Sequence, residues 1–129
     1  MPEVQVDKEI SMKAYTLISE FLDAINHSDF ELLNSKFGVS LGVYEEIQKS
    51  VESYFWDESI SLSPPPLDIA FEYRRYRIPF QFYGDENEDR CWRIECWLWN
   101  NDEESEPTAS FDLFKENDNF RLEYNSISS

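Results

Sequence analysis

Three arginines set among aromatic residues are the clearest chemical feature of this sequence. Residues 71–84 read FEYRRYRIPFQFYG and place Arg74, Arg75 and Arg77 within four positions of a chain whose net charge is −16. A guanidinium group binds carboxylates and phosphates through paired hydrogen bonds, and it stacks on aromatic rings. Arg75 and Arg77 therefore either pair with acids on neighbouring strands or form a cationic, aromatic wall that binds a partner or an anionic ligand.

Acidic residues gather in two polar segments that interrupt the apolar pattern. They are Asp85, Glu86, Glu88 and Asp89 in the first segment, and Glu116 and Asp118 in the second. If the segments are alternate turns of an antiparallel meander, they lie at the same end of the sheet, about 10 Å apart. Carboxylates there would dock on a basic cleft of a partner and raise the association rate, or they would be ordinary solvated turns. The first segment lacks the glycine and the terminal glutamate of a calcium-binding loop, so we predict no metal site.

The cysteines and the histidine do not form a recognisable catalytic or metal-binding motif. Cys91 and Cys96 lie five positions apart in a predicted strand, which places them on opposite faces and about 16 Å apart. A disulfide requires Cα atoms within about 7 Å, so these thiols cannot pair with each other. His27 follows the last apolar residues of a predicted helix, where it would interact with the terminal carbonyl groups. We therefore predict neither catalytic residues nor a cofactor.

The composition favours one acidic domain that binds basic proteins. The chain has 129 residues, with 27 acidic and 11 basic side chains, which suits a single hydrophobic core. Its charge would repel nucleic acid and anionic lipid surfaces and attract basic proteins, although the acidity would also serve solubility alone. We find neither a signal-peptide pattern nor an apolar run of membrane-spanning length, and we expect a cytoplasmic protein.

The first half of the sequence predicts three helices. Apolar residues recur at three- and four-residue steps after Asp7, the predicted N-cap: Ile10, Ala14, Leu17, Ile18, Phe21, Leu22 and Ile25. Ser28 and Glu31 form a capping-box pattern that opens a second helix through about Phe37, which Gly38 closes. Ser40 would cap a third helix that ends at about Trp56. The helices thus occupy about residues 7–56.

A proline-rich connector at residues 63–67 separates these helices from a predicted antiparallel meander at about 70–127. The fold class is α+β, with three N-terminal helices packed on a curved antiparallel sheet of four to five strands. Ile60 and Leu62 would supply the short fifth strand. The alternation changes phase at Arg74 and Arg75, which predicts a β-bulge, and Pro79 would lie on an edge or beside a bulge.

One predicted strand is apolar on both faces. Its even positions are Trp92, Ile94, Cys96 and Leu98, and its odd positions are Arg93, Glu95, Trp97 and Trp99. The sequence leaves open which face packs on the helices. If the odd face stays uncovered, Trp97 and Trp99 would mark an interface with a partner or a second copy. This pattern favours a binding protein or a homodimer.

Residues 18–38, ISEFLDAINHSDFELLNSKFG, resemble the opening of the nuclear-transport-factor-2-like superfamily. The matching features are the helix end at residues 24–26, the acidic turn at 28–29, the pair at 32–33 and Phe37. The resemblance implies a cone-shaped α+β fold. The tyrosine that helps bind the oxyanion in ketosteroid isomerases would fall at Phe21 or Leu22, and the segment GVSLGVYEEIQKS replaces an Asp-Pro-type segment of catalytic members. An isomerase or cyclase site is therefore not implied.

Small acidic members of such folds look like immunity proteins of bacterial polymorphic or contact-dependent toxin systems. This resemblance implies a non-enzymatic protein that binds and neutralises a basic toxin domain, a nuclease, by occlusion, with acidic loops that mimic phosphate. Two alternatives remain open: a small-ligand-binding protein or enzyme that uses the interior of the cone, and a structural homodimer joined through the outer sheet face.

Overall fold

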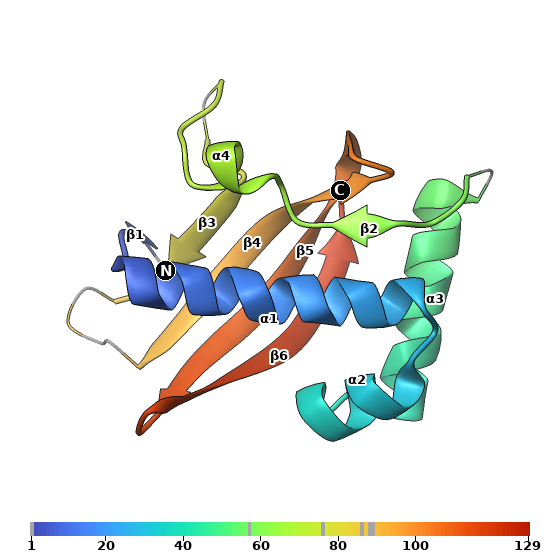
Figure 1. Ribbon diagram of the computed structural model, residues 1–129, viewed down its shortest axis with the longest axis horizontal. Helices are drawn as coiled ribbons and strands as arrows, with labels where there is room; N and C mark the ends of the chain where they lie inside the picture. Colours follow the sequence, from blue (N-terminus) through green and yellow to red (C-terminus); the bar gives the residue numbers. More distant parts are fainter. Residues whose placement is uncertain (1, 57, 76, 86, 88–89) are drawn as a thin grey trace.

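The protein has an α+β fold, as predicted, in which helices pack against a six-stranded antiparallel sheet (Figure 1). The computed structural model describes residues 2–56, 58–75, 77–85, 87 and 90–129. The helices are α1 (Lys8–Asn26), α2 (Phe30–Phe37), α3 (Leu41–Phe55) and α4 (Leu67–Ala70). The strands are β1 (Glu3–Val4), β2 (Leu62–Ser63), β3 (Phe80–Tyr83), β4 (Cys91–Asn100), β5 (Glu103–Glu116) and β6 (Asn119–Ser128). None of the described helices combines the length and the apolar character needed to span a membrane.

The predicted ends of the three long helices are confirmed, with one correction at the start of α2. Asp7 accepts a hydrogen bond from the Ile10 amide at 2.9 Å and caps α1, and Ser40 caps α3. The cap of α2 is Asp29, which accepts from the Leu32 amide at 3.1 Å, so the prediction of a capping box at Ser28 is wrong.

The correction has a cause in the way α1 ends. Ser28 has a φ of 52°, and its amide donates to Ile25, while the Asp29 amide donates to Ala24. These two bonds are those of a Schellman motif, in which the left-handed position belongs to the residue after the C-cap. Ser28 therefore terminates the first helix, and the second helix has to begin one residue later.

The sheet order is β1-β3-β4-β5-β6, and β2 pairs with β4 off this path. The meander of β4, β5 and β6 and the short strand at Leu62 were predicted. The strand β1 was not, because two paired residues leave no alternation to detect. The register of β4 on β5 shifts between Trp97 and Trp99, and that of β5 on β6 shifts between Ser110 and Phe111.

The predicted strand and β-bulge around Arg74 and Arg75 are wrong. Phe71 directly follows α4, and Arg74 and Arg77 exchange backbone hydrogen bonds of 2.8 and 3.0 Å across a tight turn. Arg75 lies in this turn with a φ of 61°. A reversal of the chain, rather than an inserted residue, therefore changes the phase of the pattern. Pro79 lies just before β3, and its carbonyl accepts from the Trp97 amide, beside the register shift in β4.

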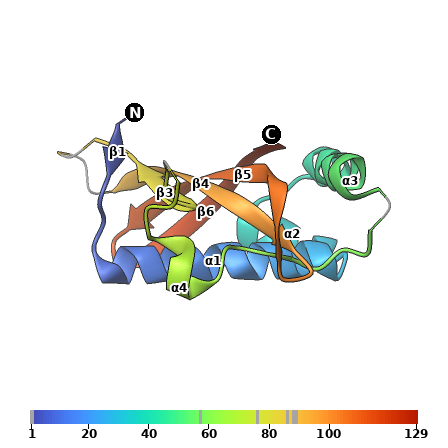
Figure 2. The ribbon, with the colours of Figure 1, turned by 90° about the horizontal axis from the view of Figure 1, so that it is seen from above.

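The even face of β4 packs on the helices. Trp92, Ile94, Cys96 and Leu98 are buried, whereas the odd residues are half-buried and form what we call the outer face of the sheet. Figure 2 shows α1 running along the inner face, and α3 lies to one side in contact with β6. The largest side chains that fill the interior without solvent exposure are Phe21, Phe80 and Phe111. The two cysteines lie on opposite faces, as predicted.

Side-chain amides fix the connector between the helices and the meander. Asn26 donates to the Leu62 carbonyl at 2.9 Å and accepts from the Leu62 amide at 2.7 Å. Asn100, also buried, accepts from the Ser61 amide at 2.8 Å. The Tyr15 hydroxyl donates to the carbonyl of Pro65 at 2.7 Å. These bonds satisfy backbone groups that a two-residue strand leaves unpaired.

Candidate partner-binding surfaces

The tight turn at residues 74–77 brings two arginines to the outer face. The guanidinium carbon of Arg77 lies 4.1 Å from the centre of a Trp97 ring, which is cation–π geometry. Arg75 Nη1 lies 3.9 Å from Glu104 Oε1. Together with Ser105 and Glu106, these residues surround a hollow of about 300 Å³. The two alternatives predicted for the arginines therefore do not exclude each other. The guanidinium groups contact neighbouring side chains, and they also line a concave surface.

Trp99 is not among the described residues that line this hollow, although its strand partner Glu104 is. It pairs with Ser63 on one side and Glu104 on the other, and its indole Nε1 is buried without a hydrogen-bond partner in the described part of the chain. The structure thus brings Arg75, Arg77 and Trp97 together around one hollow, whose described lining does not include Trp99. That these four residues form an interface stays a prediction.

Ion pairs run across the outer face. Arg93 Nε donates to Asp112 Oδ1 at 2.7 Å, and this hydrogen bond raises the pKa of the guanidinium. Arg121 pairs with Glu116 at 2.8 Å and with Glu123, and it lies over the ring of Phe114. The outer face therefore mixes charges with aromatic rings and is less apolar than the sequence suggested.

The described residues of the acidic segments, Asp85, Glu116 and Asp118, lie at the same end of the sheet, as the meander predicts (Figure 1). Asp85 begins the β3–β4 loop, and Glu116 and Asp118 lie at the β5–β6 turn. The predicted residues Glu86, Glu88 and Asp89 lie outside the described residues. A hydrogen bond of 2.8 Å from the Lys115 amide to the Arg90 carbonyl lies beside these segments, where β4 and β5 begin to pair. Since this end also contains basic side chains, docking through Asp85, Glu116 and Asp118 stays a prediction.

A second acidic surface, on α3, was not predicted. Its carboxylates are those of Glu45, Glu46 and Glu52, with Glu58 just beyond the helix, and all four are exposed without an ion-pair partner among the described residues. Two of these acids, Glu52 and Glu58, border a hollow of about 310 Å³ between α1 and α3, which is also lined by Trp56. One feature of the sequence could have indicated this surface. Trp56 directly follows the inward-facing Phe55, so the two side chains cannot lie on the same face of the helix.

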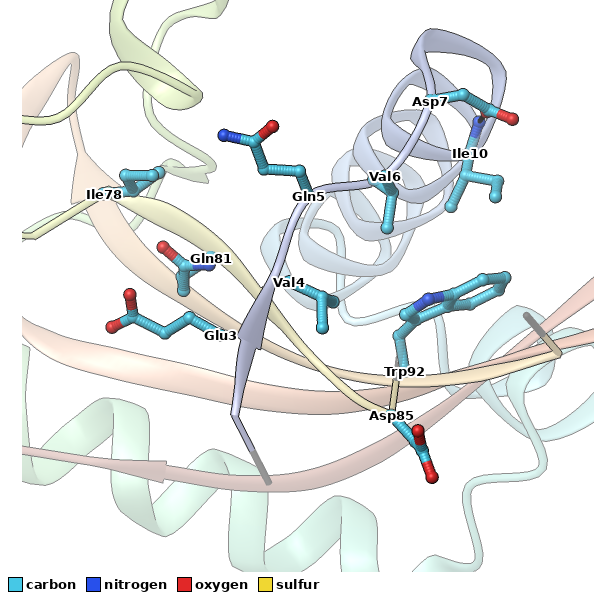
Figure 3. Close-up of a pocket in the computed structure, with 10 residues that line it drawn as sticks. All are labelled: Glu3, Val4, Gln5, Val6, Asp7, Ile10, Ile78, Gln81, Asp85 and Trp92. Atoms are coloured by element: carbon cyan, nitrogen blue, oxygen red, sulfur yellow. Dashed lines mark hydrogen bonds between the residues drawn. The ribbon is translucent and has the colours of Figure 1, made fainter. Parts of the chain in front are cut away.

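A third hollow, of about 590 Å³, adjoins the N-terminal segment that leads from β1 into α1. Figure 3 shows Val4 and Val6 on the side of Trp92, and Gln5 on the side of Ile78. The carboxylate of Asp7, which also lines the hollow, already accepts the hydrogen bond that caps α1. The carboxylates of Glu3 and Asp85 also line the hollow, but the described residues of the lining include neither a nucleophile nor a histidine that could act with them.

His27 interacts with the end of α1, as predicted. Its Nδ1 lies 2.8 Å from the carbonyl oxygen of Asp23, and this contact requires the hydrogen on Nδ1 because a carbonyl can only accept. The ring also lies 3.4 Å from the Asp23 carboxylate. His27 therefore closes the helix. Among the described residues, no cluster of histidine, cysteine and acidic side chains could hold a metal ion.

The titratable groups inside the described part of the protein are phenols and a thiol. Burial raises the pKa of Tyr124 to about 12, and the nearby carboxylate of Glu46 adds to the shift. Burial also raises the pKa values of Tyr15 and of the Cys96 thiol. Groups held in their neutral, protonated forms do not supply a general base at neutral pH.

The Tyr124 shift predicts how stability changes in alkali. The folded-state pKa lies above the value of about 10 expected for an unfolded tyrosine, so the stabilisation is complete below about pH 10 and is lost as the pH rises towards 12. We expect Tyr124→Phe to lose less stability than the wild type over this interval. Urea unfolding followed by circular dichroism from about pH 9 to about pH 11 measures this. If the free energies of unfolding of the two proteins changed equally with pH, this prediction would be contradicted.

Comparison of the chain with protein-family models, curated proteins and solved structures finds no match, so the function proposed below rests on the residues of this chain.

Proposed function

We propose that this protein is a non-enzymatic binding protein of the immunity type. It binds a basic toxin domain, which is a nuclease, and neutralises that domain by occluding it. The observation that carries the proposal is the distribution of carboxylates. Within the described residues, five of them pair with lysine or arginine and one lies beside His27, and most of the others are exposed without such a partner. The basic side chains of the outer face are largely neutralised by neighbours, so the exposed surface is dominated by unpaired negative charge.

Such a surface acts by steering and by occlusion. A net charge of −16 attracts a basic domain over distances of about one Debye length, and complementary charge raises the association rate more than the affinity. A nuclease binds phosphate groups with basic residues. Carboxylates that lie over those residues would exclude the nucleic acid without any chemical step.

The filled interior supports a binding role over a catalytic one. Phe21, Phe80 and Phe111 are fully buried between α1 and the sheet, and they occupy the space that a substrate would need. The sequence of residues 18–38 carries the resemblance to the nuclear-transport-factor-2-like superfamily. We propose that the chain is a member that uses its surface rather than its interior.

Binding to a neighbouring gene product tests this function. We expect the purified protein to bind the toxin domain encoded directly upstream, to inhibit its nuclease activity in proportion to the amount added, and to associate more slowly as ionic strength rises. Surface plasmon resonance at low and physiological salt measures the rates. A protein of similar size and charge from an unrelated fold is the control. Absence of binding to any neighbouring product, or equal inhibition by the control, would refute the proposal.

A second candidate function, binding of a small ligand, is supported by a hollow beside β1. Its volume is about 360 Å³, and its walls include Phe71, Ile78, Phe80 and Phe82 with the amides of Gln5 and Gln81. This volume lies at the lower end of the range for ligand sites, and mostly apolar walls with a few polar groups are typical of them. A thermal-shift screen of small aromatic compounds would test it, because a ligand that binds the folded state raises Tm.

A further inference from the structure

The hollow between α1 and α3, which we call the Trp56 groove, has mostly apolar walls. Its residues are Ile25, Asn26, Ser28, Tyr44, Gln48, Val51, Glu52, Phe55, Trp56, Glu58 and Ile60, and they enclose about 310 Å³. Residues of the end of α1 and of α3 line this groove together, and the chain continues from α3 into β2 (Figure 1). A groove of this size accepts one or two apolar side chains.

Trp56 borders the groove and is the most exposed of the large apolar side chains in the described structure. Its relative exposure is 78%, compared with 4% for Phe55 beside it. An exposed indole next to an apolar hollow is unfavourable in water, and tryptophan is enriched among the residues that dominate binding energy at protein interfaces.

The charge around the groove selects the kind of partner. Glu52 and Glu58 lie at its border, and neither has an ion-pair partner among the described residues. A second copy of this chain would bring the same negative charge to the same place, which opposes association. A basic segment with an apolar side chain complements both the walls and the border.

We infer that the Trp56 groove is the contact site for the basic partner, and that it receives an apolar side chain of the partner flanked by Lys or Arg. This inference rests on the proposed function and names the surface that performs it. The outer face of the sheet is less suited to a basic partner, because its carboxylates at Glu104, Asp112, Glu116 and Glu123 are already paired with arginines. The groove offers apolar contact and unpaired carboxylates in the same place.

Peptide selection tests the groove without knowledge of the natural partner. We expect the full-length protein to enrich phage-displayed short random peptides in which an apolar residue is flanked by Lys or Arg. The affinity of a selected, fluorescently labelled peptide, measured by anisotropy, should fall by at least about tenfold for Trp56→Ala and for the charge reversal Glu52→Lys. Leu41→Ala is the matched control, because Leu41 is also exposed on α3, at 59%, but does not line the groove.

The outcomes separate the groove from the proposed function. Recovery of no basic peptide, or unchanged affinity for Trp56→Ala and Glu52→Lys, overturns the groove as the contact site. If those variants still bind the neighbouring toxin domain as tightly as the wild type, the inference is again overturned while the proposed function stands. If peptides bind the groove and the toxin domain does not bind at all, the proposed function fails. Circular dichroism confirms that each variant is folded.

Discussion

Replacement of Phe21 by alanine is expected to lower the free energy of unfolding by about 3–5 kcal/mol, because it opens a cavity at the centre of the core. The ring has no exposed surface. Its centre lies 5.3 Å from that of Phe37, 5.2 Å from that of Phe111 and 5.5 Å from that of Tyr124, so one side chain joins α1, α2, β5 and β6. Because these neighbouring rings belong to different helices and strands, they cannot move inward together to fill the cavity.

Urea unfolding followed by tryptophan fluorescence measures this loss. Since domains of this size have total stabilities of about 5–15 kcal/mol, the variant lies near the limit of folding, and Phe21→Leu provides a milder test that should lose about 1 kcal/mol. Tyr73→Ala is the control, because Tyr73 is 67% exposed and should change stability by less than about 0.5 kcal/mol. A loss below about 1 kcal/mol for Phe21→Ala would mean that the site collapses around the smaller residue.

The helical half of this fold follows from local sequence information. An apolar stripe and a capping side chain act within one or two helical turns, so Asp7, Ser40 and Gly38 were assigned correctly. Ser28 was misassigned because the Schellman motif at the end of α1 competes for the same residue. Two local motifs overlapped, and the sequence alone does not rank them.

The sheet depends on contacts between distant residues, and those were predicted less completely. Alternation identified β4, β5 and β6 but could not decide which face of β4 meets the helices, since both faces carry aromatic residues. The tight turn at residues 74–77 was taken as a bulge, because either feature reverses the phase of the alternation. The pairing of β1 with β3 joins residues about eighty positions apart and involves too few residues to be detected.

The candidate binding surfaces were also predicted only in part from the sequence. The sequence predicted Arg75 and Arg77 as one candidate surface and Trp97 and Trp99 as another, and the structure places Arg75, Arg77 and Trp97 around one hollow. It could not show that Glu116 is paired with Arg121 while Glu52 and Glu58 lack partners among the described residues. Ion pairing depends on positions in space, so the acidic residues that remain available to a partner emerge only from the structure.

Replacement of Asn26 by alanine is expected to lower the free energy of unfolding by about 2–4 kcal/mol, because it removes two hydrogen bonds and leaves the Leu62 amide and carbonyl without their partner. Both bonds join the end of α1 to β2, and Leu62 is buried, so water cannot easily replace the carboxamide. Asn34→Ala is the matched control. Asn34 makes a single bond to the Val39 carbonyl from an exposed position and should lose about 1 kcal/mol or less.

Hydrogen exchange distinguishes the loss of this attachment from a general loss of stability. The Leu62 amide donates to Asn26 in the native protein, so in Asn26→Ala it should exchange faster by a larger factor than the amides of β5. Equal acceleration throughout the sheet would show that β2 opens only with global unfolding. The result also bears on the Trp56 groove, because Asn26 and Ile60 both line it. If the connector detaches, one wall of the groove moves, and peptide affinity should fall together with the protection of Leu62.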